Sequence, residues 1–249
     1  DCYYADIPSL SYAAEIKYFI HAIDLSGRVE MLPMAGYYSF DAVAGFSYSD
    51  GDINMHADPC KIAEAYAKNG AACISVLTDQ HYFGGQLEFI QQVKATIKLP
   101  VLRKDFIISE YQVWESFHAG ADAILLIADA VESSVIKDLY QLASELGLHV
   151  IIEAHNANHL EWIRDLNPEM VGVNCRDLTN METDITWFES IIKNLPQNSI
   201  WIAESGIKSH ANLEYISKLG FHAVLIGSSF MKSGDPGVAL AEMLGRVPV

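Results

Sequence analysis

Four apolar segments of this chain end in an ionisable or amide side chain. The four side chains are Lys104, Glu153, Asn174 and Glu204. Burying an ionisable or amide group without a partner is unfavourable, so each of them must be paired, hydrated or functional. A lysine together with carboxylates supplies both an acid and a base to one reaction. We therefore interpret the four residues as candidates for acid–base chemistry. A structural ion pair between Lys104 and Glu153 or Glu204 is the alternative.

Two combinations of glycine and serine follow the last two apolar segments. Ser205 and Gly206 come after one segment, and Gly227 and Ser228 come at the end of the other. Glycine lets backbone N–H groups approach an anion, and serine adds a hydroxyl donor. The loops after the seventh and eighth strands of an α/β barrel often hold a phosphate group. These residues predict a phosphate site, and ordinary tight turns are the alternative.

The candidate residues belong to a repeating pattern in which short apolar runs alternate with amphipathic stretches. The runs cover residues 40–46, 73–78, 101–104, 123–128, 150–153, 171–174, 200–204 and 223–227. Helices are expected to begin near Pro59, Leu87, Glu110, Ser134, Asn158, Thr186, Ala211 and Pro236. Eight strand–helix units in 249 residues favour a closed (β/α)8 barrel of the α/β class over an open doubly wound sheet. In such a barrel the carboxyl ends of the strands form one rim, where we expect the candidates to meet.

The segment before this pattern reads differently. Helical periodicity over Ser11–Ile23 predicts a helix in a lead-in, residues 1–39, that packs on the barrel. Residues 40–249 are expected to form the barrel itself. No linker rich in proline, glycine or serine divides the chain, so we predict a single domain.

The amino-acid composition and net charge limit the kinds of molecule that this chain can bind. Acidic residues outnumber basic ones 32 to 16, and the net charge of −16 argues against nucleic acid and anionic membrane surfaces. No apolar run reaches the length of a membrane span. The four cysteines fit no zinc spacing, so we expect no metal and free thiols in a reducing, cytoplasmic location. The predicted partner is a small molecule. If it is anionic, it needs a local positive pocket.

Taken together, these motifs resemble the indole-3-glycerol phosphate synthase family. The resemblance rests on Ser75–Asp79 with Tyr82 and Phe83, Leu102–Ile108, Ala121–Ile127, Ile152–Asn156, Val171–Leu178, Ala203–Ile207 and Leu225–Ser229. It implies a lyase of tryptophan biosynthesis that closes the indole ring of an anilino-deoxyribulose phosphate. Carbon dioxide and water are lost in that reaction, and no cofactor is used.

The resemblance also implies a role for each matching residue. Lys104 would be the general acid for ring closure, and Glu153 would transfer protons during dehydration. Asn174 and Glu204 would orient polar groups of the intermediate. Substrate binding would fall to Ser205, Gly206, Gly227 and Ser228 for the phosphate, to Phe83, Phe106 and Leu125 for the ring, and to Arg176.

The first predicted strand departs from the family pattern, which reads Ala-Glu-x-Lys-x-x-Ser-Pro-Ser-Lys-Gly. Without gaps, Ala42 and Ala44 take the positions of its glutamate and first lysine, and Asp50 takes that of its second lysine. This loss of charge leaves two alternatives open. One is an engineered or repurposed barrel that abstracts a proton from an aromatic heterocycle (a Kemp-type elimination) or performs retro-aldol cleavage through Lys104. The other is a non-catalytic phosphate-binding barrel.

Overall fold

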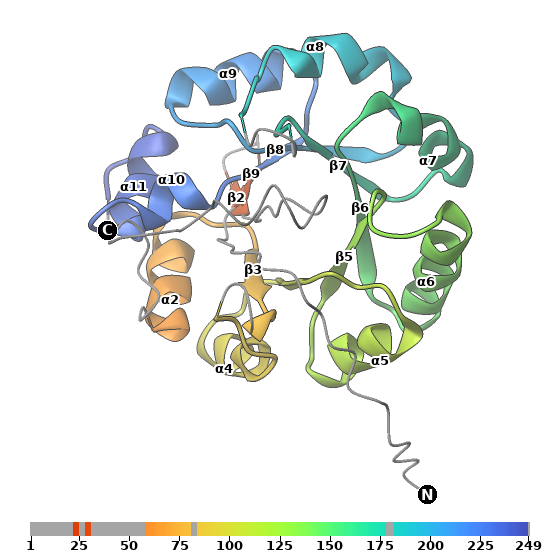
Figure 1. Cartoon of the computed structure of the whole chain (residues 1–249). Coiled ribbons are helices and arrows are strands. Elements are labelled where there is room, and N and C mark those ends of the chain that lie inside the picture. The colour runs from red at the N-terminus through yellow and green to blue at the C-terminus, as the bar shows by residue number, and fades with distance from the viewer. Residues whose placement is uncertain (1–21, 25–27, 31–57, 81–83, 178–181, 249) are drawn as a thin grey trace, which may run out of the picture.

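The computed structural model describes residues 22–24, 28–30, 58–80, 84–177 and 182–248. Within them, seven parallel strands form a curved sheet in chain order, and helices cover its outer side (Figure 1). The strands are β3 (Ile74–Leu77), β4 (Val101–Lys104), β5 (Ala123–Ile127), β6 (His149–Ala154), β7 (Met170–Asn174), β8 (Ile200–Glu204) and β9 (Ala223–Leu225). Each coincides with an apolar run expected from the sequence. The remaining run, residues 40–46, lies outside the described residues.

Helices follow the strands as the pattern predicts. They are α2 (Pro59–Asn69), α4 (Glu88–Thr96), α5 (Glu110–His118), α6 (Ser133–Glu145), α7 (Leu160–Leu166), α8 (Trp187–Ile191), α9 (His210–Lys218), α10 (Ser228–Met231) and α11 (Pro236–Met243), with 3₁₀ turns at Ala157–His159 and Ile192–Asn194. The short helix α10 was not predicted. In the described part of the chain, no helix is long and apolar enough to cross a membrane.

Local sequence explains where helix α2 begins and ends. The Asp58 side chain accepts hydrogen bonds from the backbone N–H groups of Cys60 and Lys61, and proline occupies the first helical position. At the other end Gly70 adopts a left-handed conformation with φ of 102°, and its N–H donates to the carbonyl of Tyr66. Both end signals are the ones read from the sequence.

Two short N-terminal strands extend the sheet beyond β9. Strand β1 (Ala22–Asp24) runs antiparallel to β9, and β2 (Arg28–Glu30) pairs with both. The helix predicted for Ser11–Ile23 is therefore wrong at Ala22 and Ile23, and the rest of it lies outside the described residues. Side-chain periodicity does not reveal that the edge of β9 offers backbone groups in need of hydrogen-bond partners.

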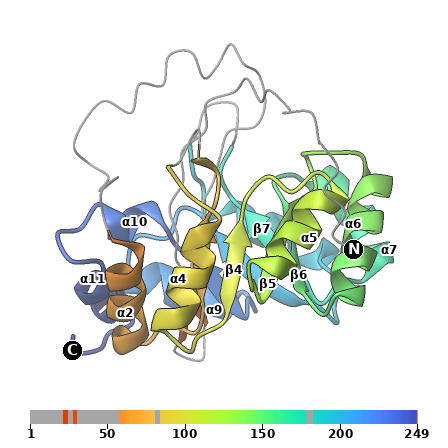
Figure 2. The same ribbon diagram turned by 90° about the horizontal axis from the view of Figure 1, so that it is seen from below.

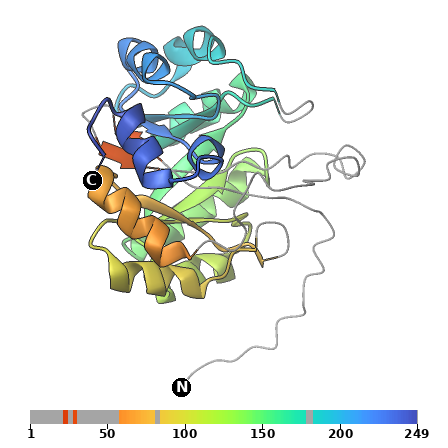
Figure 3. The same ribbon diagram turned by 90° about the vertical axis from the view of Figure 1, so that its left-hand side faces the viewer.

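The last helix packs against the first described one. Helix α11 lies beside α2, seen in blue and orange in Figure 3. The approach is close at Gly237, where a Cβ atom would lie 2.8 Å from Asn69 Nδ2 and 3.0 Å from Ala65 Cβ. Helices from the two ends of the described barrel therefore close the outer ring.

Strand register decides which side chains face the interior. Glu153 pairs with Gly172, and Asn174 pairs with Glu204. Paired residues of parallel strands point to the same face, and so do residues two apart in one strand. Glu153, Asn174 and Glu204 therefore share the inner face at the carboxyl ends of β6, β7 and β8.

Candidate active site

The four candidate acid–base residues meet in the interior of the barrel. Lys104 Nζ lies 2.7 Å from Glu153 Oε2 and 3.9 Å from Glu204 Oε2. Asn174 Nδ2 donates to Glu153 Oε1 over 3.1 Å. All four side chains are almost fully buried. The structural ion pair considered from the sequence is therefore present, and it lies where the strand ends form a common rim.

The two glutamates differ in how firmly they hold a proton. Burial raises the pKa of Glu153, but the positive charges of Lys104 and His155 outweigh burial and lower it. Burial and the negative charge of Glu153 raise the pKa of Glu204 well above its ordinary value. Neither Glu204 oxygen has a hydrogen-bond partner among the described residues. The site thus combines an ionised carboxylate with a carboxyl group that keeps its proton to a higher pH.

Gly172 makes room for the second glutamate and was missed by sequence reasoning. A Cβ atom at this position would lie 2.1 Å from Glu204 Oε1. The signal in the sequence was a glycine inside an otherwise apolar strand. Such a glycine often marks a place where another group comes close to the backbone.

His155 contacts Glu153, and Asp129 contacts His155. Sequence reasoning gave neither His155 nor Asp129 a role. His155 Nε2 lies 2.8 Å from Glu153 Oε1, and His155 Nδ1 lies 3.0 Å from Asp129 Oδ2. His155 follows β6 and Asp129 follows β5. The signal in the sequence was a histidine two residues after the strand-end glutamate.

The residues expected to bind phosphate lie in the loops after β8 and β9. Ser205 and Gly206 both have left-handed backbone conformations, with φ of 68° and 72°. A Cβ atom at Gly206 would lie 2.8 Å from Ile185 Cγ2 and 2.9 Å from Cys175 Sγ, so only glycine fits. Gly227 directly precedes α10, where it accepts from the N–H groups of two helix residues. Ser228 begins α10.

Adjacent contacts join these loops to the rest of the site. The Ser229 hydroxyl donates to the carbonyl of Ile207, which links the loop after β9 to the loop after β8. The backbone N–H of Arg176 donates to Asn174 Oδ1 over 3.0 Å, so one amide side chain holds both Glu153 and the loop after β7.

Two of the three residues expected to face an aromatic ring can be placed. Phe106 and Leu125 are both buried, and Leu125 is fully so. Phe83 lies outside the described residues, as do Ala42, Ala44 and Asp50 of the first predicted strand.

A buried arginine supports Lys104 from the other face of β4. Strand β4 lies between α4 and α5 (Figure 2). Arg103 lies 2.8 Å from Asp105 Oδ2 and 2.7 Å from Glu115 Oε2 of α5, and its Nε donates to Thr78. Asp105 in turn accepts from the backbone N–H of Phe106. These contacts fix the turn that follows Lys104.

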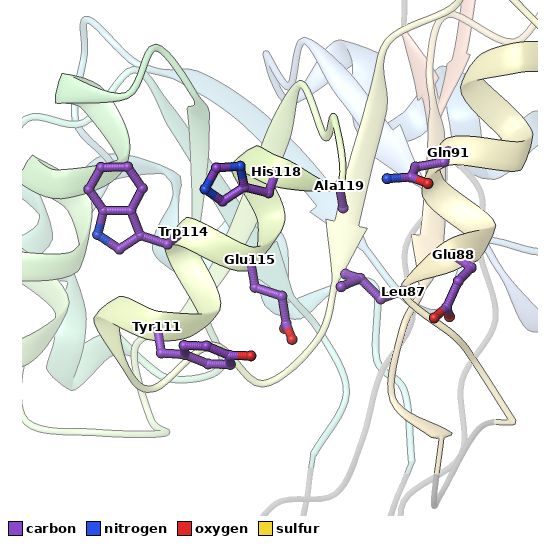
Figure 4. A pocket seen from close by; sticks show the side chains of 8 residues that line it. All are labelled: Leu87, Glu88, Gln91, Tyr111, Trp114, Glu115, His118 and Ala119. Atoms are coloured by element: carbon purple, nitrogen blue, oxygen red, sulfur yellow. The ribbon is translucent and has the colours of Figure 1, made fainter. Parts of the chain in front are cut away.

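A groove of about 380 Å³ lies outside the barrel, between α4 and α5 (Figure 4). Leu87 and Glu88 line one side, and Tyr111 and Glu115 line the other. It contains none of the candidate site residues, so it is separate from the acid–base cluster.

The fold and the buried acid–base cluster define an α/β-barrel enzyme. The profile of the family described as indole-3-glycerol phosphate synthase matches residues 43–243. An indole-3-glycerol phosphate synthase from Polynucleobacter necessarius subsp. necessarius (strain STIR1) is 44% identical over 185 residues, which are 74% of this chain and 69% of that protein. The chain belongs to the indole-3-glycerol phosphate synthase family. Its reaction is therefore the decarboxylating ring closure of tryptophan biosynthesis, and neither alternative reading gains support.

Solved structures of more distant proteins agree on the fold. Orotidine 5'-phosphate decarboxylase from Pyrococcus horikoshii OT3 has a TM-score of 0.59 at 15% identity and covers 74% of this chain and 90% of its own. N-acetylmannosamine-6-phosphate 2-epimerase from Clostridium perfringens has a TM-score of 0.56 at 16% identity. The match covers 73% of this chain and 83% of the epimerase chain. At these identities the likeness concerns the fold alone, and it confirms the predicted barrel class.

The order of the family's first-strand glutamate and lysine occurs in the chain before residue 40. Residues Ala14-Glu15-Ile16-Lys17 have the order Ala-Glu-x-Lys of the family pattern. They lie before the matched residues 43–243 and outside the described residues.

Proposed function

We propose that this chain carries out the indole-3-glycerol phosphate synthase reaction with Lys104 as general acid and Glu153 as the proton-accepting carboxylate. The observation that carries the proposal is the 2.7 Å contact between Lys104 Nζ and Glu153 Oε2, whose side chains are almost fully buried. A buried acid next to a buried base suits a reaction that needs both. Water-free surroundings also strengthen each electrostatic contact with the substrate.

The proposed steps follow from the charges of the groups. Lys104 donates a proton to the carbonyl oxygen of the substrate as the aromatic carbon attacks the carbonyl carbon. Loss of carbon dioxide from that aromatic carbon restores the ring, and the new hydroxyl group takes a proton from the carboxyl group of Glu204 and leaves as water. Glu153 accepts the proton that the intermediate gives up as the indole double bond forms. Asn174 and the protonated Glu204 orient the polar groups of the intermediate.

We propose that the substrate is held at both of its ends. The phosphate group lies against Ser205, Gly206, Gly227 and Ser228, where left-handed backbone at the first two positions supports an anion-binding loop. Phe106, Leu125 and Phe83 face the anilino ring, and Arg176 adds a positive charge. The expectations that no nucleic acid is bound and that the location is cytoplasmic stay predictions from the sequence.

The test is turnover of the anilino-deoxyribulose phosphate, followed by the fluorescence of the indole product. Lys104→Ala is expected to lower kcat by at least about 100-fold, because it removes a general acid. Lys94→Ala is the matched control. Lys94 pairs with Asp122 at 2.6 Å on the outside of the barrel, so turnover should be unchanged. Equal loss in both variants, or full activity of Lys104→Ala, would contradict the assigned role.

A second arm of the same assay concerns Lys17. If Ala14–Lys17 supplies the charges of the family pattern, Lys17→Ala should lower kcat/KM on the order of 100-fold, because a positive charge that acts on the substrate would be lost. Unchanged kinetics would show that the pattern at these residues has no catalytic part.

A further inference from the structure

A line of hydrogen-bonded side chains runs from Glu153 towards the surface. His155 lies between Glu153 Oε1 at 2.8 Å and Asp129 Oδ2 at 3.0 Å. The other oxygen of Asp129 contacts His159 Nε2 at 2.9 Å and accepts from Asn156 Nδ2 at 2.8 Å. The exposed fraction of the side chain rises along this line, from 0% at Glu153 and 6% at His155 to 26% at His159.

The geometry requires His155 to carry a positive charge. Both of its ring nitrogens face a carboxylate oxygen within 3.0 Å. A neutral imidazole has one N–H group and would direct a lone pair at one of the two carboxylates, whereas an imidazolium donates to both. Burial lowers the pKa of His155, but Glu153 and Asp129 outweigh burial and raise it to about 9.

Glu153 is therefore held between two cations. Lys104 contacts Oε2, while His155 and the amide of Asn174 contact Oε1. When Lys104 gives its proton to the substrate, one of these charges disappears. An isolated carboxylate in this buried position would then take up a proton and cease to be a base.

We propose that His155, anchored by Asp129, is a positioning residue that keeps Glu153 ionised and correctly oriented while Lys104 is deprotonated. This inference rests on the proposed roles of Lys104 and Glu153. Asp129 acts through His155 and touches none of the proposed reacting groups. Glu204 of β8 is the other ionisable group beside Glu153, and His159 and Asn156 are the other polar groups on Asp129.

Asp129→Asn tests the proposal with little change of shape. The His155 charge is present below its pKa and is lost as the pH rises through that value. Without the Asp129 charge this loss occurs at lower pH. The alkaline limb of kcat/KM should therefore move at least about one pH unit lower. At pH 9 kcat should fall at least about fivefold, while KM stays within about twofold because Asp129 touches none of the groups proposed to bind the substrate.

His149→Gln provides a matched control. His149 is on the same strand, β6, and its Nδ1 lies 2.8 Å from Glu169 Oε2, but both side chains are more than half exposed. This variant removes a histidine–carboxylate pair that has no contact with Glu153. Its pH profile should coincide with that of the unmodified chain.

An NMR titration of the histidine side chains can be carried out on the unmodified protein. It requires neither an activity assay nor a variant that folds. His155 is expected to titrate near pH 9 and to move down in Asp129→Asn. The proposal is overturned if His155 titrates at the ordinary value, or if Asp129→Asn has a lower Tm with an unshifted pH profile. Retained turnover in Glu153→Gln would instead refute the role of Glu153, so the two failures can be told apart.

Discussion

Glu153 and Glu204 are chemically identical residues that the barrel interior makes different. Glu153 is stabilised as an anion by Lys104 and His155, whereas Glu204 has no hydrogen-bond donor among the described residues. Burial and the negative charge of Glu153 raise the pKa of Glu204, whereas Lys104 and His155 lower the pKa of Glu153 in spite of its burial. A single small site thus holds a base and a potential proton donor at the same pH.

Glu204 makes stability fall as the pH rises. Above about 4.5 the unfolded chain releases this proton while the folded protein keeps it, so the free energy of unfolding decreases until the pH passes the raised pKa. Glu204→Gln removes this dependence. Urea unfolding at pH 5 and at pH 8 measures this change. From pH 5 to pH 8, the decrease in the free energy of unfolding should be smaller in the variant than in the unmodified protein by at least about 1 kcal/mol.

The control for that measurement is Glu145→Gln, which changes an exposed carboxylate on α6. It should follow the pH dependence of the unmodified protein. Parallel stability curves for Glu204→Gln and the unmodified protein would show that Glu204 is ionised in the folded state.

At the scale of elements, the loop after β8 shows how backbone shape supports the proposed phosphate site. Two consecutive left-handed residues, Ser205 and Gly206, turn the chain directly after Glu204. The neighbouring side chains of Ile185 and Cys175 leave no space for a Cβ atom at Gly206. The loop is thus fixed by contacts as well as by its own conformational preference.

Gly206→Ala is expected to raise KM about tenfold, because a shift of the loop would move the proposed phosphate donors out of hydrogen-bond range. Gly120→Ala is the matched control, since Gly120 also has a positive φ, 82°, but has no atom within 4 Å of its Cβ position. Both variants should lose about 1 kcal/mol of stability through backbone strain, and Gly206→Ala should lose about a further 1–3 kcal/mol through overpacking against Ile185 and Cys175. A similar KM in the two variants would argue against a binding role for this loop.

The sequence predicted most of the strands but only part of the candidate site. Strands β3 to β9 were predictable because each is a continuous apolar run between helical stretches. Strands β1 and β2 were not, because their partner β9 is about 200 residues away in sequence.

The candidate site was predictable where strand ends carry polar residues, as at Lys104 and Glu153. Asp129 and His155 escaped assignment to a role because nothing in the sequence joins the two residues. They meet only because β5 and β6 are neighbours in the sheet. Gly172 escaped for the same reason, since its close partner Glu204 lies on the next strand.

At the scale of the whole molecule, the described barrel is closed by a helix contact between its two ends. Helix α11 packs on α2 around Gly237, where atoms of Ala65 and Asn69 leave no room for a side chain. Gly237→Val should therefore cost about 1–3 kcal/mol of stability by overpacking and lower the Tm. Gly234→Val, with no atom within 4 Å of its Cβ position, is the control and should have little effect. Equal Tm values for Gly237→Val and Gly234→Val would contradict a tight contact between α2 and α11 at Gly237.

Cys175 lies beside the loop proposed to bind phosphate, and its Sγ donates to the carbonyl of Ser205. Burial raises the pKa of this thiol to about 12. Oxidants and alkylating agents attack the thiolate rather than the thiol. The chain therefore keeps a cysteine beside the loop proposed to bind phosphate in its unreactive thiol form, and alkylating agents should leave Cys175 unmodified.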